Sequence, residues 1–240
     1  MLDKNSSIPL WEQLDEILKE KIENKVWQSG DMITSENELC KEYSISRMTA
    51  RSVITRLVQQ GLLYRVPGKG TFVAEPKIHT EPLAYMGIRE QLEKKGYKIR
   101  TEVLANTLIV APTRIEKILN LNTPTTVYFI ERIRYIDNKP LSIHRSYLRQ
   151  LFNPPILNER LGKEQLCRIL RDDYKIIPTS TKETLELIFA NEDQAEKLGV
   201  DESYPLLYLQ DTRYHIDTII EYTEVFFKGD KLRINFEYNG

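Results

Sequence analysis

Residues 44–73 read SISRMTARSVITRLVQQGLLYRVPGKGTFV, a stretch that contains no acidic side chain. Its basic side chains are Arg47, Arg51, Arg56, Arg65 and Lys69. Residues 3–42 instead carry five basic and ten acidic side chains, and the whole chain is near neutral, with 34 Lys and Arg against 35 Asp and Glu. A cluster of one sign creates a local field that attracts a polyanion, although a solvated helix face with accidental charge is the alternative explanation.

The spacing of apolar residues predicts three helices before Gly61. Pro9 suits a first helical turn, and apolar residues recur every three or four positions after it, at Leu10, Leu14, Ile17, Leu18 and Ile22. Ser35 can cap a short second helix that runs through Glu42. Ser46 can cap a third helix that ends before Gly61.

Two short helices joined by a tight turn, the second with cations and hydroxyl groups near its start, form a helix-turn-helix pattern. Arg47 and Arg51 are four residues apart and share one helix face. The segment after Gly61 predicts a β-hairpin whose glycine-rich turn, PGKG, carries Lys69 at its tip. The major groove of DNA admits a helix, and an arginine can fork onto a guanine edge or a phosphate. An acid-free surface is what contact with DNA phosphates requires.

Residues 9–73 resemble the winged-helix domain of GntR-type bacterial transcription regulators. The resemblance is carried by the runs PLWEQL, GDMITSENEL, SISRMTAR and GLLYRVPGKGTFV, whose spacing is unbroken. It implies three groups of DNA-binding residues: the start of the second helix, the recognition helix and the wing tip. They are, in that order, Ser35, Glu36 and Asn37; Arg47, Thr49 and Arg51; Lys69 and Gly70. Asn37 stands where the family often has Arg, so a phosphate contact there would be weaker or made differently.

Several of these residues also have a purely structural explanation. Thr49 can belong to the cap of its helix, Glu36 can orient neighbouring arginines, and Gly70 can serve only the turn. Arg56 and Arg65 can form salt bridges within the domain instead of contacting DNA.

The remaining chain predicts a second domain of a different character. We expect a DNA-binding domain at residues 1–74, a linker at 75–82 and a second domain at 83–240, with helices and a mostly antiparallel sheet, an α+β fold. Two segments of the second domain resemble each other, each running from a helix end through a loop into a strand, a turn and a strand. They read EKILNLNTPTTVYFIERIRYIDNKPLSIHRSYL and EKLGVDESYPLLYLQDTRYHIDTIIEYTEVFF. Such a repeat suggests a pseudo-symmetric sheet around a central site.

This arrangement resembles the UTRA domain, the effector-binding domain of the HutC subfamily of GntR regulators, which has a chorismate-lyase-like fold. The resemblance implies that Arg132, Arg134, His144 and Glu221 hold a small effector. Arg132 and Arg134 match the family's R-x-R, which binds acidic effectors, often sugar phosphates. Two residues apart on a strand share one face, and the guanidinium fork matches a carboxylate or a phosphate. Glu221 matches a glutamate that holds ligand hydroxyls, whereas His144 stands where Glu is common.

Alternatives exist for this site as well. Both arginines can bridge to Glu131 or Asp137, and Glu221 can form an edge salt bridge. Many sugar-phosphate sensors carry hydroxyl side chains at two helix starts, where this chain has YMGI at residues 85–88 and LCR at residues 166–168. The expected effector is therefore a small anionic metabolite, of which a sugar phosphate is one example.

The bulk composition, 41% hydrophobic and 29% charged, is typical of a globular protein. No apolar run approaches the roughly 18 residues of a membrane span, and the N-terminal segment lacks the apolar core of a secretory signal. We therefore expect a cytoplasmic protein without membrane contact. Cys40, Cys167 and the three histidines lack the paired spacing of a zinc site, and no GxSxG, HExxH or GxGxxG motif appears. We expect no metal, no cofactor and no enzymatic activity.

The sequence thus predicts a sequence-specific DNA-binding transcription regulator, a repressor, whose affinity for double-stranded operator DNA is controlled by an effector. By the resemblance it acts as a homodimer, which would place two recognition helices in successive major grooves. Two alternatives remain open. One is an architectural DNA-binding protein whose second domain ignores ligands, and the other is a lyase-like enzyme, which the resemblance of the second domain to the chorismate-lyase fold suggests.

Overall fold

The computed structural model describes residues 2–81, 87–122, 124–150, 156 and 158–236. The chain divides into two compact units, Met1–Lys77 and Ile78–Gly240, each with hydrophobic clusters of its own. No helix in the described part of the chain is both long enough and apolar enough to span a bilayer.

The first unit is built on three helices, α1 (Leu10–Glu23), α2 (Glu36–Tyr43) and α3 (Arg47–Gln59). The predicted caps are present, because the side chains of Ser35 and Ser46 accept hydrogen bonds from the backbone N–H groups three residues later. The inward faces of the helices form one core with residues of the hairpin that follows. Its fully buried members include Leu14, Leu18, Leu39, Ala50 and Leu57.

The predicted hairpin is also present, as β1 (Leu63–Val66) paired antiparallel with β2 (Gly70–Val73). Gly68 and Gly70 adopt positive φ angles of 73° and 135°, conformations that favour glycine, so the tight turn that presents Lys69 depends on them. The segment before α2 joins this hairpin, since the Ile33 N–H donates to the Thr71 carbonyl at 2.9 Å. The hairpin is therefore fixed to the start of α2.

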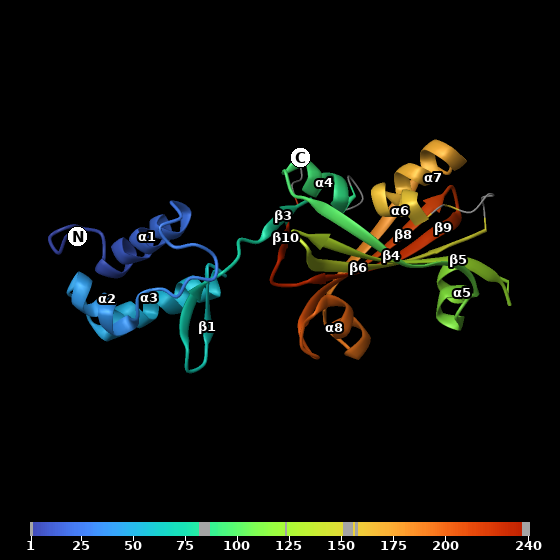
Figure 1. Ribbon diagram of the computed structural model, residues 1–240. Helices are drawn as coiled ribbons and strands as arrows, with labels where there is room; N and C mark the ends of the chain where they lie inside the picture. The colour runs from blue at the N-terminus through green and yellow to red at the C-terminus, as the bar shows by residue number, and fades with distance from the viewer. Residues whose placement is uncertain (1, 82–86, 123, 151–155, 157, 237–240) are drawn as a thin grey trace. The chain divides into compact units, whose positions relative to one another are not determined.

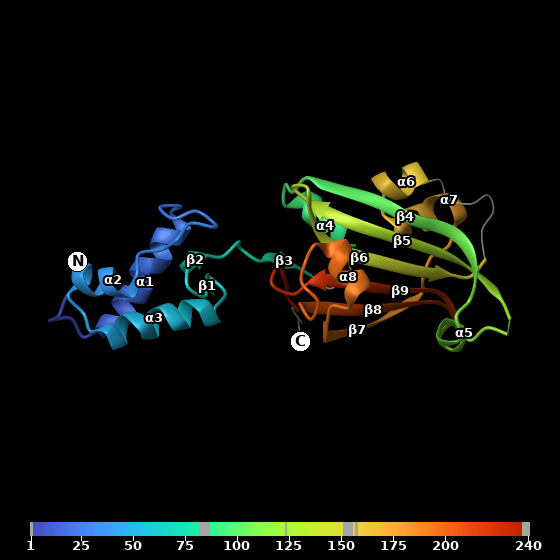
Figure 2. The same ribbon diagram turned by 60° about the horizontal axis from the view of Figure 1, so that its bottom comes forward.

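The second unit contains a six-stranded antiparallel sheet in the order β4-β5-β6-β9-β8-β7. The strands are β4 (Ile99–Val110), β5 (Thr126–Ile136), β6 (Lys139–Leu148), β7 (Ser180–Phe189), β8 (Pro205–His215) and β9 (Thr218–Lys228). Figure 2 shows β4 and β7 at opposite edges of the sheet. The α+β fold with a mostly antiparallel sheet is thus confirmed.

Helices cover both faces of this sheet (Figure 1). One face carries α4 (Ile88–Lys94), α6 (Asn158–Lys163) and α7 (Leu166–Tyr174). The other carries α5 (Thr113–Leu119) and α8 (Glu192–Leu198). Apolar side chains alternate along the strands between these two layers, as the two-residue period of a strand requires.

The internal repeat seen in the sequence is a repeat in the structure. Strand, helix, strand, strand occurs twice, as β4-α5-β5-β6 and as β7-α8-β8-β9. The order of strands is palindromic about the β6–β9 pair, so the two halves meet at the centre of the sheet. Both helices end in a left-handed residue, Asn120 after α5 and Gly199 after α8.

The segment expected to be a linker contains a strand. Part of the segment predicted as a linker at 75–82 is strand β3 (Ile78–Thr80), which pairs in parallel with β10 (Leu232–Ile234). A three-residue strand carries too little periodicity to be read from sequence, and its partner lies at the far end of the chain. The expected start of the second domain, residue 83, lies outside the described part of the chain, which resumes at residue 87 before α4.

Because each unit has its own core, we expect each to unfold by itself when its core is damaged. Phe227 is fully buried in the second unit and Leu57 in the first. Phe227→Ala should cost the second unit about 3–5 kcal/mol, and Leu57→Ala should cost the first about 2–5 kcal/mol. Both tryptophans, Trp11 and Trp27, lie in the first unit, so tryptophan fluorescence reports on that unit.

In thermal unfolding, Phe227→Ala should shift the transition seen by circular dichroism and leave the fluorescence transition in place, and Leu57→Ala should shift the fluorescence transition. A Phe227→Ala protein whose fluorescence transition moves by the same amount would show that the two units unfold as one.

Candidate functional site

The start of α2 is held by a reciprocal cap. The Glu38 N–H donates to the Ser35 hydroxyl at 3.3 Å, and the Glu38 carboxylate accepts from the Ser35 N–H at 3.0 Å and from its hydroxyl at 2.7 Å. These hydrogen bonds lower the pKa of the Glu38 carboxyl. The Ser35 side chain is thus engaged in the cap, and the N-terminal turn of α2 has a fixed geometry.

Two of the five cations of the acid-free stretch are paired within the first unit. Arg56 lies 3.8 Å from the Asp15 carboxylate and its guanidinium stands 4.8 Å from the centre of the Trp11 ring. Arg65 lies 3.6 Å from Glu36 and donates to the Thr55 hydroxyl at 3.0 Å. Glu36 therefore orients Arg65, which is the structural explanation that the sequence offered for Glu36.

The other three cations are exposed, and their side chains have no ion pair or hydrogen bond with any residue that the structure describes. These are Arg47, Arg51 and Lys69. A groove of about 480 Å³ lies between the start of α2, the start of α3 and the hairpin tip. It brings together six of the predicted residues, Ser35, Glu36, Asn37, Arg47, Lys69 and Gly70.

Thr49 and Arg51 do not line this groove. The Thr49 hydroxyl lies 2.8 Å from the Ser46 hydroxyl, within the cap of α3. This is the structural explanation that the sequence offered for Thr49. Arg51 is exposed one turn further along the helix. Of the five cations of the acid-free stretch, three are therefore unpaired among the described residues, and all three belong to the residues predicted to bind DNA.

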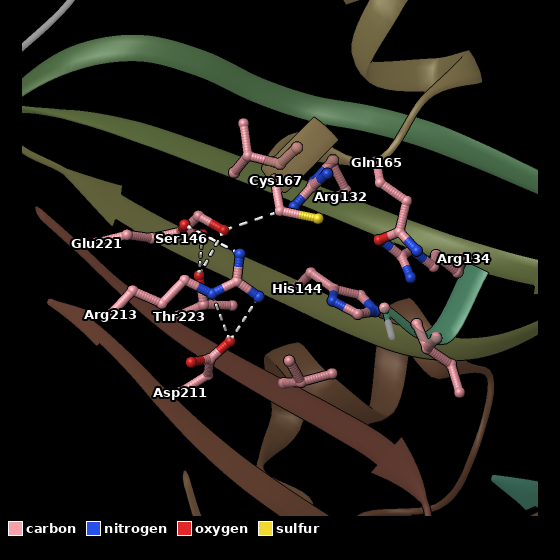
Figure 3. A pocket seen from close by; sticks show the side chains of 14 residues that line it. Arg132, Arg134, His144, Ser146, Gln165, Cys167, Asp211, Arg213, Glu221 and Thr223 are labelled. Atoms are coloured by element: carbon pink, nitrogen blue, oxygen red, sulfur yellow. Dashed lines mark hydrogen bonds and ion pairs between the residues drawn. The ribbon is translucent and has the colours of Figure 1, made fainter. Parts of the chain in front are cut away.

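A second candidate site lies at the centre of the six-stranded sheet (Figure 3). It is a cavity of about 40 Å³ between the four central strands and the starts of α4 and α7. All four predicted effector residues line it, Arg132 and Arg134 from β5, His144 from β6 and Glu221 from β9. They meet there because alternate residues of each strand point to the same face.

The two arginines of β5 are buried, and neither forms an ion pair with a residue that the structure describes. Arg132 is 3% exposed and Arg134 is 4% exposed, and Nε and Nη1 of each have no hydrogen-bond partner among the described residues. Burial lowers the pKa of Arg132 to about 10, and burial together with the Arg132 charge lowers the pKa of Arg134 well below its usual value. The alternative of a bridge to Glu131 fails, because that carboxylate pairs with Arg145 at 2.8 Å and Lys197 at 2.9 Å.

The opposite end of the cavity is a network of paired charges. Arg213 of β8 lies 2.9 Å from Asp211 and 3.6 Å from Glu221. Although burial opposes it, the two carboxylates raise the pKa of the Arg213 guanidinium. Thr223 donates to Glu221 at 2.9 Å and lies 2.8 Å from the Ser146 hydroxyl. This end of the cavity therefore presents carboxylate and hydroxyl oxygens, and its charges are paired with one another.

His144 sits between the two ends of the cavity as a neutral side chain. Burial, followed by the charges of Arg134 and Arg132, lowers its pKa well below the usual value. Its Nε2 atom lies 2.9 Å from the Ser142 hydroxyl. A neutral imidazole can donate one hydrogen bond and accept another, so His144 adds polarity to the cavity without adding charge.

Sequence reasoning missed several lining residues, chiefly Asp211, Arg213, Ser146 and Thr223. A signal for two of them was present. Asp211 and Arg213 repeat, on the first strand of the second hairpin, the two-residue spacing of Arg132 and Arg134 on the first strand of the first. Within the described residues, no cluster of His, Cys, Asp and Glu could hold a metal ion.

Comparison with known proteins gives two family matches. Residues 10–73 match the family described as bacterial regulatory proteins, gntR family, and residues 94–233 match the UTRA domain. The chain is 32% identical to the uncharacterized HTH-type transcriptional regulator YurK of Bacillus subtilis, over 89% of this chain and 88% of that protein. It is 30% identical to the HTH-type transcriptional repressor NagR of the same organism, over 96% and 95%.

Among solved structures, PhnF from Mycobacterium smegmatis superposes with a TM-score of 0.64 at 22% identity, over 96% of this chain and 99% of that one. At that identity the likeness supports the fold alone. Together with the family matches, it agrees with the winged-helix and UTRA architecture predicted from the sequence.

The uncompensated arginines lead to a prediction about stability. A buried charge without a partner is costly, and replacing it with an apolar side chain of similar length removes that cost. Arg134→Met should therefore raise the free energy of unfolding of the ligand-free protein by about 1–3 kcal/mol.

The matched control is Arg213→Met, which leaves Asp211 and Glu221 buried without their cation. It should lower the free energy of unfolding by about 3–5 kcal/mol. Denaturant unfolding of both variants checks this, and a destabilised Arg134→Met would contradict the assignment of Arg134 as unpaired.

Proposed function

This chain belongs to the GntR family of bacterial regulatory proteins, and from that membership we propose that it represses transcription until a small anionic metabolite binds between the central strands of its UTRA domain. It is a DNA-binding transcription regulator, and this family membership sets aside the lyase-like enzyme alternative. What we add is the sign of regulation, the chemistry of the effector and the residues that hold it. The observation that carries this proposal is the pair of buried guanidinium groups whose Nε and Nη1 atoms have no hydrogen-bond partner among the described residues.

The two ends of the cavity suit the two ends of one ligand. Arg132 and Arg134 can form parallel hydrogen bonds to a phosphate or a carboxylate, which would also relieve the cost of burying them unpaired. Glu221, Ser146 and Thr223 can bind hydroxyl groups at the other end. A sugar phosphate has both features. Relatives are named for fructoselysine utilization and for mannosyl-D-glycerate transport and metabolism, which fits a hydroxyl-rich effector.

The cavity is too small for such a ligand as it stands. Its 40 Å³ is well below the roughly 300–1,000 Å³ of small-molecule sites. The Gln165 side chain, which precedes α7, closes it against Gly87, where even a Cβ atom would collide with the carboxamide. Gln165 Nε2 has no hydrogen-bond partner among the described residues, so displacing the side chain breaks no hydrogen bond of that atom. An effector would thus bind by displacing Gln165 and shifting the starts of α4 and α7.

Such a shift can control DNA binding only if the effector prefers one of two states of the protein. We propose that the protein acts in the cytoplasm as a homodimer, whose two α3 helices occupy successive major grooves of a palindromic operator. Arg47, Arg51 and Lys69 would supply the phosphate and base contacts, near the backbone contacts of Ser35, Glu36, Asn37, Thr49 and Gly70.

A thermal-shift screen tests the effector site directly. A ligand that binds only the native state raises the melting temperature, and the stabilisation grows with the logarithm of its concentration relative to its Kd. We expect a rise with a phosphorylated or carboxylated sugar, none with the neutral sugar, and loss of the rise in Arg132→Ala. The matched control is Arg100→Ala on the neighbouring strand, where the arginine is half exposed and pairs with Glu102 at 3.0 Å.

A rise that persists in Arg132→Ala would place the ligand elsewhere. The same ligand should release operator DNA in an anisotropy assay. Operator affinity that stays constant in the presence of every stabilising ligand would favour the architectural alternative.

The count of unpaired cations sets the salt dependence of operator binding. Three per subunit give about six phosphate contacts per dimer, so log K should fall with log salt at a slope of about −5. If the paired Arg56 and Arg65 also bound phosphates, the slope would approach −9. Arg47→Ala should reduce the slope by about 2, and Arg56→Ala should leave it unchanged. A titration across a salt series measures this, and a reduced slope in Arg56→Ala would show that its pairing with Asp15 is given up on DNA.

A further inference from the structure

The outward face of α3 is centred on a methionine. The buried stripe of this helix is Ala50, Val53, Ile54 and Leu57, each at most 1% exposed. At 100° per residue, Met48 lies about 170° from the middle of that stripe, which makes it the most outward residue of the first turn. Its side chain is 80% exposed, the highest value for a large hydrophobic side chain in the described part of the chain.

The residues around Met48 are directed elsewhere or are charged. Thr49 is turned to the cap, with its hydroxyl 2.8 Å from that of Ser46. Arg47 lines the groove that leads to the hairpin tip. Arg51, three residues after Met48, is exposed and lies beside it on the helix surface. Met48 thus projects beside two exposed arginines, which lie on one side of it and have no ion pair in the part of the structure described.

This setting favours one kind of partner. A single exposed apolar side chain has no special meaning by itself. Next to two cations without ion pairs, however, an apolar protein surface would have to bury two charges without partners, whereas DNA supplies phosphates for the cations. In a helix-turn-helix domain, the N-terminal residues of the recognition helix are those that contact base edges.

The major groove has one apolar feature, the 5-methyl group of thymine. A methionine side chain is unbranched and flexible, so its thioether and terminal methyl can follow the position of that group. We propose that Met48 contacts the 5-methyl group of one thymine in each operator half-site and so selects T·A at that position. This inference rests on the proposed docking of α3 in the major groove.

The experiment removes the methyl group from the DNA. An operator is first obtained by selection with the purified full chain, and each thymine is then replaced in turn by deoxyuridine, which keeps base pairing and the polar edge. At one symmetric position we expect wild-type affinity to fall about fourfold per half-site, and about fifteenfold when both half-sites are changed, as burial of one methyl group predicts.

Met48→Ala should bind the thymine and deoxyuridine operators with equal affinity, which forms a double-mutant cycle with the DNA. Met48→Leu keeps an apolar side chain and should retain part of the discrimination. Val26→Ala, a change at another exposed apolar residue away from α3, should retain all of it. Circular dichroism and the melting temperature of each variant establish that it is folded.

The outcomes separate this inference from the proposed function. Wild-type protein that selects no operator would count against DNA binding by α3 altogether. Specific binding that is insensitive to deoxyuridine at every thymine would overturn the role of Met48 and leave the regulator intact. Sensitivity that survives in Met48→Ala would assign the methyl contact to another residue.

Discussion

The antiparallel pairing of β6 with β9 is the contact on which the second unit depends. It joins two copies of a strand-helix-hairpin unit, and its register places Ser146 opposite Thr223 and Leu148 opposite Glu221. Because side chains alternate across a sheet, this register brings the polar residues of four strands to one face. A slip by one residue would turn Glu221 and Thr223 to the opposite face, away from Arg132. The cavity therefore exists only where the two halves meet.

Both units contain cations that are paired with carboxylates and cations that are not. The paired cations stabilise the fold, whereas the unpaired ones are candidates for binding an anion. Arg56, Arg65 and Arg213 have carboxylate partners within the protein, so their charges are compensated in the free state. Arg132 and Arg134 are buried and form no ion pair with a carboxylate in the described part of the chain. An uncompensated buried charge lowers stability, and it persists where binding of an anion can remove the cost. We therefore expect the ligand-free protein to be less stable than the same fold without these two buried charges.

The residues that close the cavity are linked to other parts of the second unit. The Gln165 carboxamide fills the space beside Gly87, immediately before α4. The same helix is tied to β3, because the Gln91 side chain bonds both the N–H and the carbonyl of Glu81, and Lys95 donates to the His79 carbonyl. An occupant that displaces Gln165 would act at one end of α4, whose other contacts hold the strand nearest the DNA-binding unit in sequence.

The sequence by itself determined the winged helix, the alternating strands, the internal repeat and some of the residues that line each candidate site. These features depend on local spacing: caps at Ser35 and Ser46, glycines at the hairpin turn, and Arg-x-Arg on one strand. It did not determine which charges are compensated. The pairing of Arg56 with Asp15, the exclusion of Glu131 from Arg132, and the place of Arg213 between Asp211 and Glu221 depend on residues far apart in the chain. Only tertiary structure sets those distances, and an electrostatic interaction is decided by distance and burial rather than by order along the chain.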